Sequence, residues 1–109
     1  MGLLSKLFGG STKTDLPAMM RDGALLIDAR SPPEFQGGSI EGAINLPHDI
    51  IGTKISTIES DKNRPIVIYC QSGGRSAMAV HALKKAGYTH VENGGAIEAL
   101  TRQLEQHHG

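Results

Sequence analysis

The sequence contains one cysteine, Cys70, and it stands at the end of the apolar run 66–69. A strand, a glycine-containing loop and a helix N-terminus together direct several backbone N–H groups at one point, where an anion can bind. The residues after Cys70 fit that arrangement, because they are small, polar or basic and lead directly into a helical pattern: Gln71, Ser72, Gly73, Gly74, Arg75 and Ser76. The two glycines allow tight curvature, and a guanidinium suits a tetrahedral oxyanion.

This loop should also change the reactivity of the Cys70 sulfur. A free thiol with a pKa of about 8.5 is only about 3% thiolate at pH 7. The N–H dipoles and the Arg75 charge both favour the anion, so we expect the pKa of Cys70 to be lowered. These residues predict a nucleophilic cysteine that acts on a small anion. The alternative is an inert buried cysteine before a plain connection; a P-loop is not matched, because no second glycine followed by Lys stands at its spacing.

A second polar group, Asp28, Ala29 and Arg30, follows the apolar run 24–27. Ligand sites of open α/β sheets lie at the carboxyl ends of strands. We therefore expect Asp28 and Arg30 near the Cys70 loop, either in the site or as a structural ion pair. For Asp28 the structural role is the favoured interpretation.

The elements that must position these groups alternate along the chain. Both apolar runs are typical of strands covered on two faces, and residues 42–46 and 90–92 are weaker strand candidates. Helices are expected over 16–21, 32–36, 47–58, 75–86 and 96–106, the first of them after the capping signal Thr14–Asp15. The pattern predicts an α/β fold with a mainly parallel central sheet and helices on both faces.

Length and composition exclude several classes of protein. The chain has 109 residues, with eleven basic and eleven acidic side chains, which suits one domain and argues against a general nucleic-acid binder. One cysteine cannot form an internal disulfide or a thiolate zinc knuckle. Because no signal peptide or spanning run of ~18 apolar residues is present, we expect a cytoplasmic protein without stable membrane insertion.

The first thirteen residues are expected to lie outside the domain, which we place at residues 14–106. Leu3, Leu4, Leu7 and Phe8 would share one side of a short helix, and residues 9–13 are small and polar like a linker. The apolar side could contact a partner, a membrane surface or the domain. A frayed terminus is the favoured interpretation.

Three motifs in order resemble the single-domain rhodaneses, a family of sulfurtransferases. The first is the loop Cys70–Ser76, similar to the family's Cys-x-x-Gly-x-Arg-Ser. The others are the stretch 26–47, similar to the upstream signature, and 91–95, similar to the C-terminal one. Ser39 replaces a usual His and Ala96 a usual Trp, which affects local packing more than the loop. Cysteine phosphatases use Cys-x5-Arg, whereas Cys70 and Arg75 have the shorter spacing that the resemblance associates with sulfur transfer.

The resemblance implies a ping-pong reaction in which Cys70 is the catalytic nucleophile and carries a persulfide. Arg75 and the loop residues 71–76 would bind a small anionic donor such as thiosulfate, Arg30 would steer it, and Asp28 would support the loop. A thiol, or cyanide in vitro, would accept the sulfur, and no metal or organic cofactor is expected. The alternatives are a persulfide carrier for a sulfur-accepting protein and a non-catalytic regulatory domain, and the presence of Cys70 and Arg75 counts against the second.

Other candidate residues have ordinary interpretations. Glu34 and Phe35 fit a helix that covers the sheet, the first in water and the second buried. His48 is expected at the surface or rim. His107 and His108 are adjacent in a polar tail and do not share a helix face, so no metal site is expected there.

Overall fold

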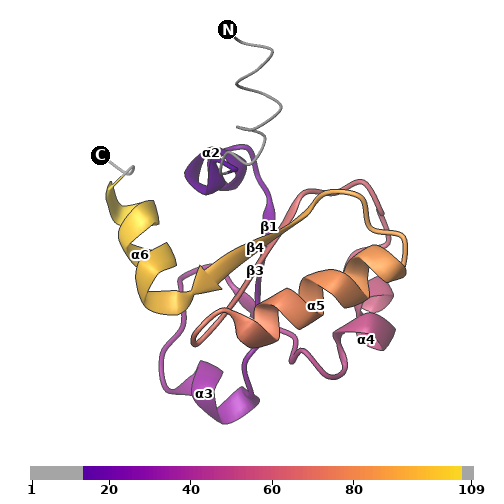
Figure 1. Cartoon of the computed structure of the whole chain (residues 1–109), viewed down its shortest axis with the longest axis horizontal. Helices are drawn as coiled ribbons and strands as arrows, with labels where there is room; N and C mark the ends of the chain where they lie inside the picture. Colours follow the sequence, from indigo (N-terminus) through magenta and orange to yellow (C-terminus); the bar gives the residue numbers. More distant parts are fainter. Residues whose placement is uncertain (1–13, 107–109) are drawn as a thin grey trace, which may run out of the picture.

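The computed structural model describes residues 14–106, so the expected N-terminal segment and the histidine pair at 107–108 lie outside the described residues. Four parallel strands form one sheet in the order β2-β1-β3-β4 (Figure 1). The strands are β1 (Leu25–Asp28), β2 (Ile44–Asn45), β3 (Ile66–Cys70) and β4 (Val91–Ala96), and the helices are α2 (Leu16–Arg21), α3 (Pro32–Gln36), α4 (Ile51–Ile58), α5 (Gly74–Lys85) and α6 (Ile97–Gln106).

The two central strands are buried on both faces, which explains their unbroken apolar runs. Side chains alternate along a strand, so Ile66 and Ile68 of β3 pack in the same cluster as residues of α4 and α5. Val67 and Tyr69 pack in the second cluster, with residues of α2 and α6. The prediction of an α/β fold with helices on both faces is confirmed, and all the strand pairs of the described residues are parallel.

Local capping interactions determine where several helices begin and end. The Asp15 side chain accepts a hydrogen bond from the N–H of Ala18 at 3.1 Å and begins α2. Ser31 and Glu34 form a reciprocal capping box at the start of α3. Gly87, with φ of 100°, follows the last residues of α5 and allows the chain to turn back toward β4.

Two predicted elements differ most from the structure, each by four residues at one end. The expected helix over 47–58 begins only at Ile51, because residues 47–50 form a turn closed by a hydrogen bond from the Ile50 N–H to the Pro47 carbonyl at 3.1 Å. The weak strand expected over 90–92 extends to Ala96. Its two glycines lower strand propensity, but pairing with β3 overrides it.

β4 contains an irregularity at those glycines. Ile68 pairs with Asn93 while Tyr69 pairs with Gly95, so Gly94 is an extra residue in β4. A Cβ on Gly94 would lie only 3.0 Å from methyl groups of Leu100 and Val67. Gly95 has φ of 83°. The tight packing and the left-handed backbone both require glycine here, and they set the direction of Asn93 beside the Cys70 loop.

Because all four strands run in one direction, their carboxyl ends meet at one edge of the sheet. Figure 1 shows the loop after β3 at this edge, entering α5 close to α3. The polar residues after β1 and the Cys70 loop after β3 are therefore neighbours, since β1 and β3 pair directly, with Asp28 opposite Tyr69. Within residues 14–106 no helix is long and apolar enough to cross a membrane.

Candidate active site

The Cys70 sulfur lies at the base of the loop that joins β3 to α5. The residue is fully buried. The backbone N–H of Gly73 donates to Sγ at 2.9 Å and that of Ser76 at 3.3 Å. Gly73 has φ of 103° and is the N-terminal cap of α5, a backbone conformation that only glycine adopts at low cost. The loop therefore curls around the sulfur as the sequence predicted.

Two opposing effects act on the ionisation of Cys70. Burial, the larger single effect, raises the pKa of the thiol because it removes water from the charged form. Hydrogen bonds from the Ser76 side chain and from the backbone of Ser76, Gly73 and Ser72 lower it, and together they outweigh burial, so the pKa of Cys70 lies below its ordinary value. The sulfur is thus arranged to hold a negative charge, as a nucleophile requires.

The Ser76 hydroxyl connects the sulfur to β4. Its oxygen lies 3.4 Å from Cys70 Sγ, 3.0 Å from the Gly73 carbonyl oxygen and 2.7 Å from Asn93 Oδ1. Ser76 is fully buried on the first turn of α5. This predicted loop residue contacts the Cys70 sulfur itself.

The guanidinium of Arg75 does not stand free in the loop. Its Nη1 and Nη2 donate to Glu34 Oε1 at 2.7 Å and Oε2 at 3.0 Å, a two-pronged contact between α5 and α3. The hydrogen bonds from Arg75, with those from Ser31, hold the pKa of Glu34 well below its usual range. The expectation that Glu34 lies in water was therefore incomplete, and Phe35 is half-buried rather than buried.

Arg30 and Asp28 form the ion pair that the structural interpretation anticipated. Arg30 Nη2 lies 2.8 Å from Asp28 Oδ2, and both side chains are almost completely buried. The Arg30 guanidinium also donates to Gln71 Oε1 at 3.2 Å and to the Gly38 carbonyl at 2.7 Å. Arg30 thus links the end of β1 to the first residue of the Cys70 loop, while its steering of a donor stays a prediction.

Two neighbouring side chains hold this edge of the sheet in place. Asn45 of β2 donates to the carbonyls of Asp28 at 3.0 Å and Arg30 at 2.9 Å. The Tyr69 hydroxyl accepts from the N–H of Ile40 at 3.0 Å, and burial is the main cause that raises the pKa of Tyr69 to about 12. Neither residue carried a sequence signal for this role, since both looked like ordinary strand residues.

The structure brings the predicted site residues together in one region. Gly73 and Ser76 point N–H groups at Sγ, Gln71 contacts Arg30, and Gln71, Ser72 and Gly74 are exposed at the surface of the loop. Sequence reasoning did not single out Glu34 and Asn93 as parts of the site. The available signal for Asn93 was its position at the carboxyl end of a strand, directly before two glycines.

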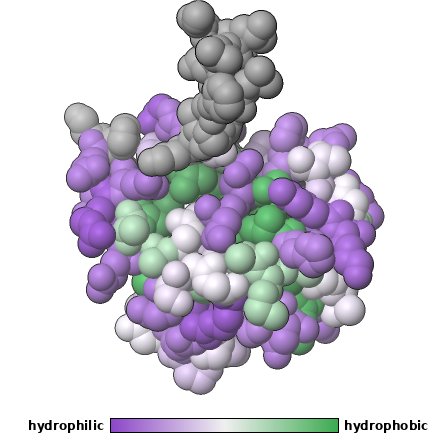
Figure 2. Space-filling model, in the orientation of Figure 1, coloured by the Kyte–Doolittle hydropathy of each residue, from purple (hydrophilic) through white to green (hydrophobic). Residues whose placement is uncertain are grey.

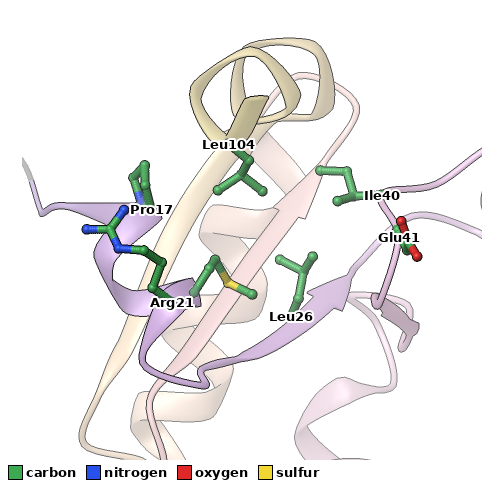
Figure 3. A pocket seen from close by; sticks show the side chains of 7 residues that line it. Pro17, Arg21, Leu26, Ile40, Glu41 and Leu104 are labelled. Carbon is green, nitrogen blue, oxygen red and sulfur yellow. The ribbon is translucent and has the colours of Figure 1, made fainter. Parts of the chain in front are cut away.

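The surface near the loop has a hollow of about 330 Å³ lined by Ser31, Pro32, Pro47, His48, Asp49, Ile50 and Arg75. A larger apolar hollow of about 440 Å³ lies elsewhere, between α2, α6 and the segment that carries Ile40 and Glu41 (Figure 3). Apolar surface near α2 and α6 is also seen in Figure 2. No Cys70 loop residue lines this second hollow. In the described part of the chain, no three His, Cys, Asp or Glu side chains gather as metal ligands.

The chain is similar in sequence to known sulfurtransferases. The chain is 40% identical over 74 residues to "Thiosulfate sulfurtransferase PspE" of Escherichia coli, covering 68% of this chain and 71% of that protein. It is 44% identical over 75 residues to a "Sulfurtransferase" of Allochromatium vinosum, covering 67% and 68%.

Solved structures share the fold. An Escherichia coli rhodanese with anions superposes with a TM-score of 0.67 at 38% identity, covering 70% of this chain and 89% of that one. The human single-domain sulfurtransferase TSTD1 gives a TM-score of 0.68 at 26% identity, covering 87% and 93%. A family model described as "Rhodanese-like domain" matches residues 12–96. With most of the chain matched and Cys70 in the expected loop, the chain belongs to the rhodanese-like domain family.

Proposed function

We propose that the protein is a sulfurtransferase that moves a sulfane sulfur from thiosulfate, or a similar small anionic donor, to a thiophilic acceptor through a persulfide on Cys70. The observation that carries the proposal is the Cys70 sulfur itself, which receives N–H donors from Gly73 at 2.9 Å and Ser76 at 3.3 Å. These donors stabilise a thiolate, and thiolate rather than thiol is the attacking form.

In the first step the Cys70 thiolate attacks the outer sulfur of thiosulfate. A sulfur–sulfur bond forms to Cys70 while the bond inside thiosulfate breaks, and its electron pair leaves with sulfite. In the second step an acceptor, cyanide in vitro or a thiol in the cell, attacks the outer sulfur of the persulfide and returns Cys70 to the thiolate. The chain has no second cysteine, so an outside acceptor must take this sulfur.

The residues of the Cys70 loop have different roles in this reaction. Gly73 and Ser76 stabilise the charge on Cys70, while Gln71, Ser72 and Gly74 face the surface from which a donor approaches. Because Arg75 forms an ion pair with Glu34, we assign it two roles: it holds the loop against α3, and its positive charge attracts the donor. Asp28 supports Arg30, which reaches Gln71.

Mass measurement tests the proposal directly. After incubation with thiosulfate, the wild-type chain should gain the mass of one sulfur atom and lose it again on addition of cyanide. Cys70→Ser should gain nothing. A double variant, Cys70→Ser with Ser72→Cys, places a thiol in the exposed part of the same loop and controls for simple thiol exposure. Equal sulfur loading of that variant, or none on the wild type, would contradict the proposal.

The second candidate is a persulfide carrier that serves a partner protein and turns over slowly with free donors. One comparison favours it: "Probable adenylyltransferase/sulfurtransferase MoeZ" of Mycobacterium tuberculosis matches 73% of this chain at 37% identity, but the match spans only 21% of that longer protein. Deleting residues 1–10 distinguishes the candidates. Unchanged thiosulfate turnover together with lost binding of a partner would favour the carrier. A cytoplasmic location stays a prediction for both.

A further inference from the structure

Asn93 has a side chain whose orientation is determined by its neighbours. The backbone N–H of Gly95 lies 2.8 Å from the outer amide atom assigned as Oδ1. An N–H group can only donate, so the atom that faces it must be the oxygen rather than the amide nitrogen. The Asn93 Nδ2 then donates toward the Gly73 carbonyl at 3.4 Å. The bulge at Gly94 and Gly95 therefore presents a fixed acceptor to the interior of the site.

That acceptor faces the Ser76 hydroxyl, which has a single proton. Three acceptors lie within reach of it: Asn93 Oδ1 at 2.7 Å, the Gly73 carbonyl at 3.0 Å and Cys70 Sγ at 3.4 Å. The Gly73 carbonyl already accepts two other hydrogen bonds, from the N–H of Ala77 at 3.1 Å and from Asn93 Nδ2 at 3.4 Å, whereas Asn93 Oδ1 accepts one, from the N–H of Gly95 at 2.8 Å. Asn93 offers the shortest contact, so Asn93 and Cys70 compete for one proton.

The favoured arrangement depends on the charge of the sulfur. When the sulfur is a neutral thiol, its S–H group donates a hydrogen bond to Ser76 Oγ, and the Ser76 hydroxyl donates to Asn93 Oδ1. A thiolate instead needs the Ser76 proton, because hydrogen bonds to an ionised partner are about twice as strong as neutral ones. We propose that Asn93 is a positioning residue that competes with Cys70 for the Ser76 hydroxyl proton and thereby limits the fraction of Cys70 present as thiolate.

The same competition bears on turnover, and this part rests on the proposed function. When Cys70 carries a persulfide, its inner sulfur is neutral and no longer needs the Ser76 proton. Asn93 accepts that proton and keeps the buried hydroxyl satisfied, which avoids the cost of an unpaired buried donor. Asn93 thus favours the neutral forms of Cys70, while the Gly73 and Ser76 N–H groups favour the thiolate.

Other charged groups surround the site, and substitutions of Asn93 and Ser76 leave all of them in place. Arg75 on α5 is paired with Glu34 of α3, and Arg30 after β1 is paired with Asp28. Glu92 precedes Asn93 on β4, and His48 lines a hollow with Arg75. Because all of them are retained, a difference between variants reports on the link from Asn93 to Ser76.

The test measures the pH dependence of alkylation of Cys70 by iodoacetamide, which needs no sulfur donor, in the full chain. Asn93→Ala releases the Ser76 proton to the sulfur, and we expect the pKa of Cys70 to fall by about half a unit to one unit. Alkylation at a pH below this pKa should accelerate by roughly three- to tenfold. Asn93→Leu keeps the shape of the side chain without its acceptor and should act in the same direction.

A double-mutant cycle separates this role from a structural one. In a Ser76→Ala background, Asn93→Ala should leave the pKa of Cys70 unchanged, because no hydroxyl remains to be shared. Asn63→Ala, at an exposed site that contacts Thr89, is the control and should have no effect. A raised or unchanged pKa in both Asn93→Ala and Asn93→Leu, or the same shift without the Ser76 hydroxyl, would overturn the inference. Absence of sulfur loading would refute the proposed function but leave this titration result intact.

Discussion

Replacing Gly73 by alanine tests whether the loop backbone sets the charge of Cys70. Gly73 has φ of 103°, and its N–H lies 2.9 Å from Sγ. A left-handed backbone costs a non-glycine residue roughly 1–2 kcal/mol. If the loop keeps its shape, Gly73→Ala loses this stability, and the melting temperature falls by roughly 4–8 °C for each kcal/mol in a domain of this size.

The loop could instead relax toward a negative φ, and the N–H would then turn away from the sulfur. A hydrogen bond to a charged group contributes about 1.5–3 kcal/mol, so its loss would raise the pKa of Cys70 by about one to two units. The strain and the lost hydrogen bond are alternatives for the same backbone. We therefore expect one of three results for Gly73→Ala: a lower melting temperature alone, a higher pKa of Cys70 alone, or smaller changes in both.

Gly74→Ala is the matched control. Gly74 is the first residue of α5, its φ is not positive, and no atom outside its neighbours lies within 4 Å of an added Cβ. It should leave both quantities nearly unchanged. The two measurements are thermal unfolding by circular dichroism and thiolate absorbance near 240 nm against pH. The absorbance is specific, because Cys70 is the only cysteine and burial raises the pKa of Tyr69 to about 12.

Two results would refute this reasoning. Gly73→Ala could leave both the melting temperature and the pKa of Cys70 at their wild-type values, which would mean that the positive φ and the N–H contact carry no energy. Gly74→Ala could reproduce the effects of Gly73→Ala, which would mean that any side chain in the loop is harmful and that the backbone conformation is irrelevant.

The remaining predictions concern the pH dependence of stability, the packing of the sheet and one ion pair. The pKa of Cys70 is lowered in the folded chain, so between that pKa and about 8.5 the unfolded chain binds more protons than the folded chain. The free energy of unfolding should therefore rise with pH in this range, and it should fall as the pH drops through the folded pKa. Cys70→Ser should remove this difference in stability, measured by urea unfolding at pH 6 and pH 9. Gly94→Ala places a Cβ 3.0 Å from two core side chains and should lower the free energy of unfolding by about 1–3 kcal/mol. Gly52→Ala lies on an exposed turn of α4 with only ordinary contacts and should raise it by about 0.5–1 kcal/mol. Equal urea midpoints for the two variants would contradict the packing argument. Glu34→Gln and Arg75→Lys should each slow sulfur transfer from thiosulfate by similar factors, and the double variant no further, because each breaks the same two-pronged contact; additive losses would show that the pair does not act as a unit.

Much of the fold could be read from local patterns. The unbroken apolar runs before Asp28 and Cys70 predicted two strands buried on both faces, and β1 and β3 are such strands. The capping signal at Thr14–Asp15 predicted where the first helix begins. These features depend on residues close in sequence, so the sequence alone determines them.

The elements that failed are those in which distant contacts override local preference. The expected helix started at Pro47, but the His48 N–H donates to the Ala29 carbonyl at 3.0 Å, and α4 begins only at Ile51. Asn93, Gly94 and Gly95 lie beyond the short strand expected over 90–92. Pairing with β3 makes them the continuation of β4, with a bulge that no local propensity encodes.

The candidate site divides in the same way. The sequence determined that Cys70 is the nucleophile candidate, that a glycine-containing loop follows it, and that Asp28 and Arg30 end a neighbouring strand. Only the tertiary structure decided which side chains meet. Arg75 pairs with Glu34, and the Ser76 hydroxyl lies between Cys70 and Asn93. The physical reason is separation along the chain, because hydrogen-bond partners 17 or 41 residues apart are chosen by the packing of α3, β4 and α5 rather than by any local pattern.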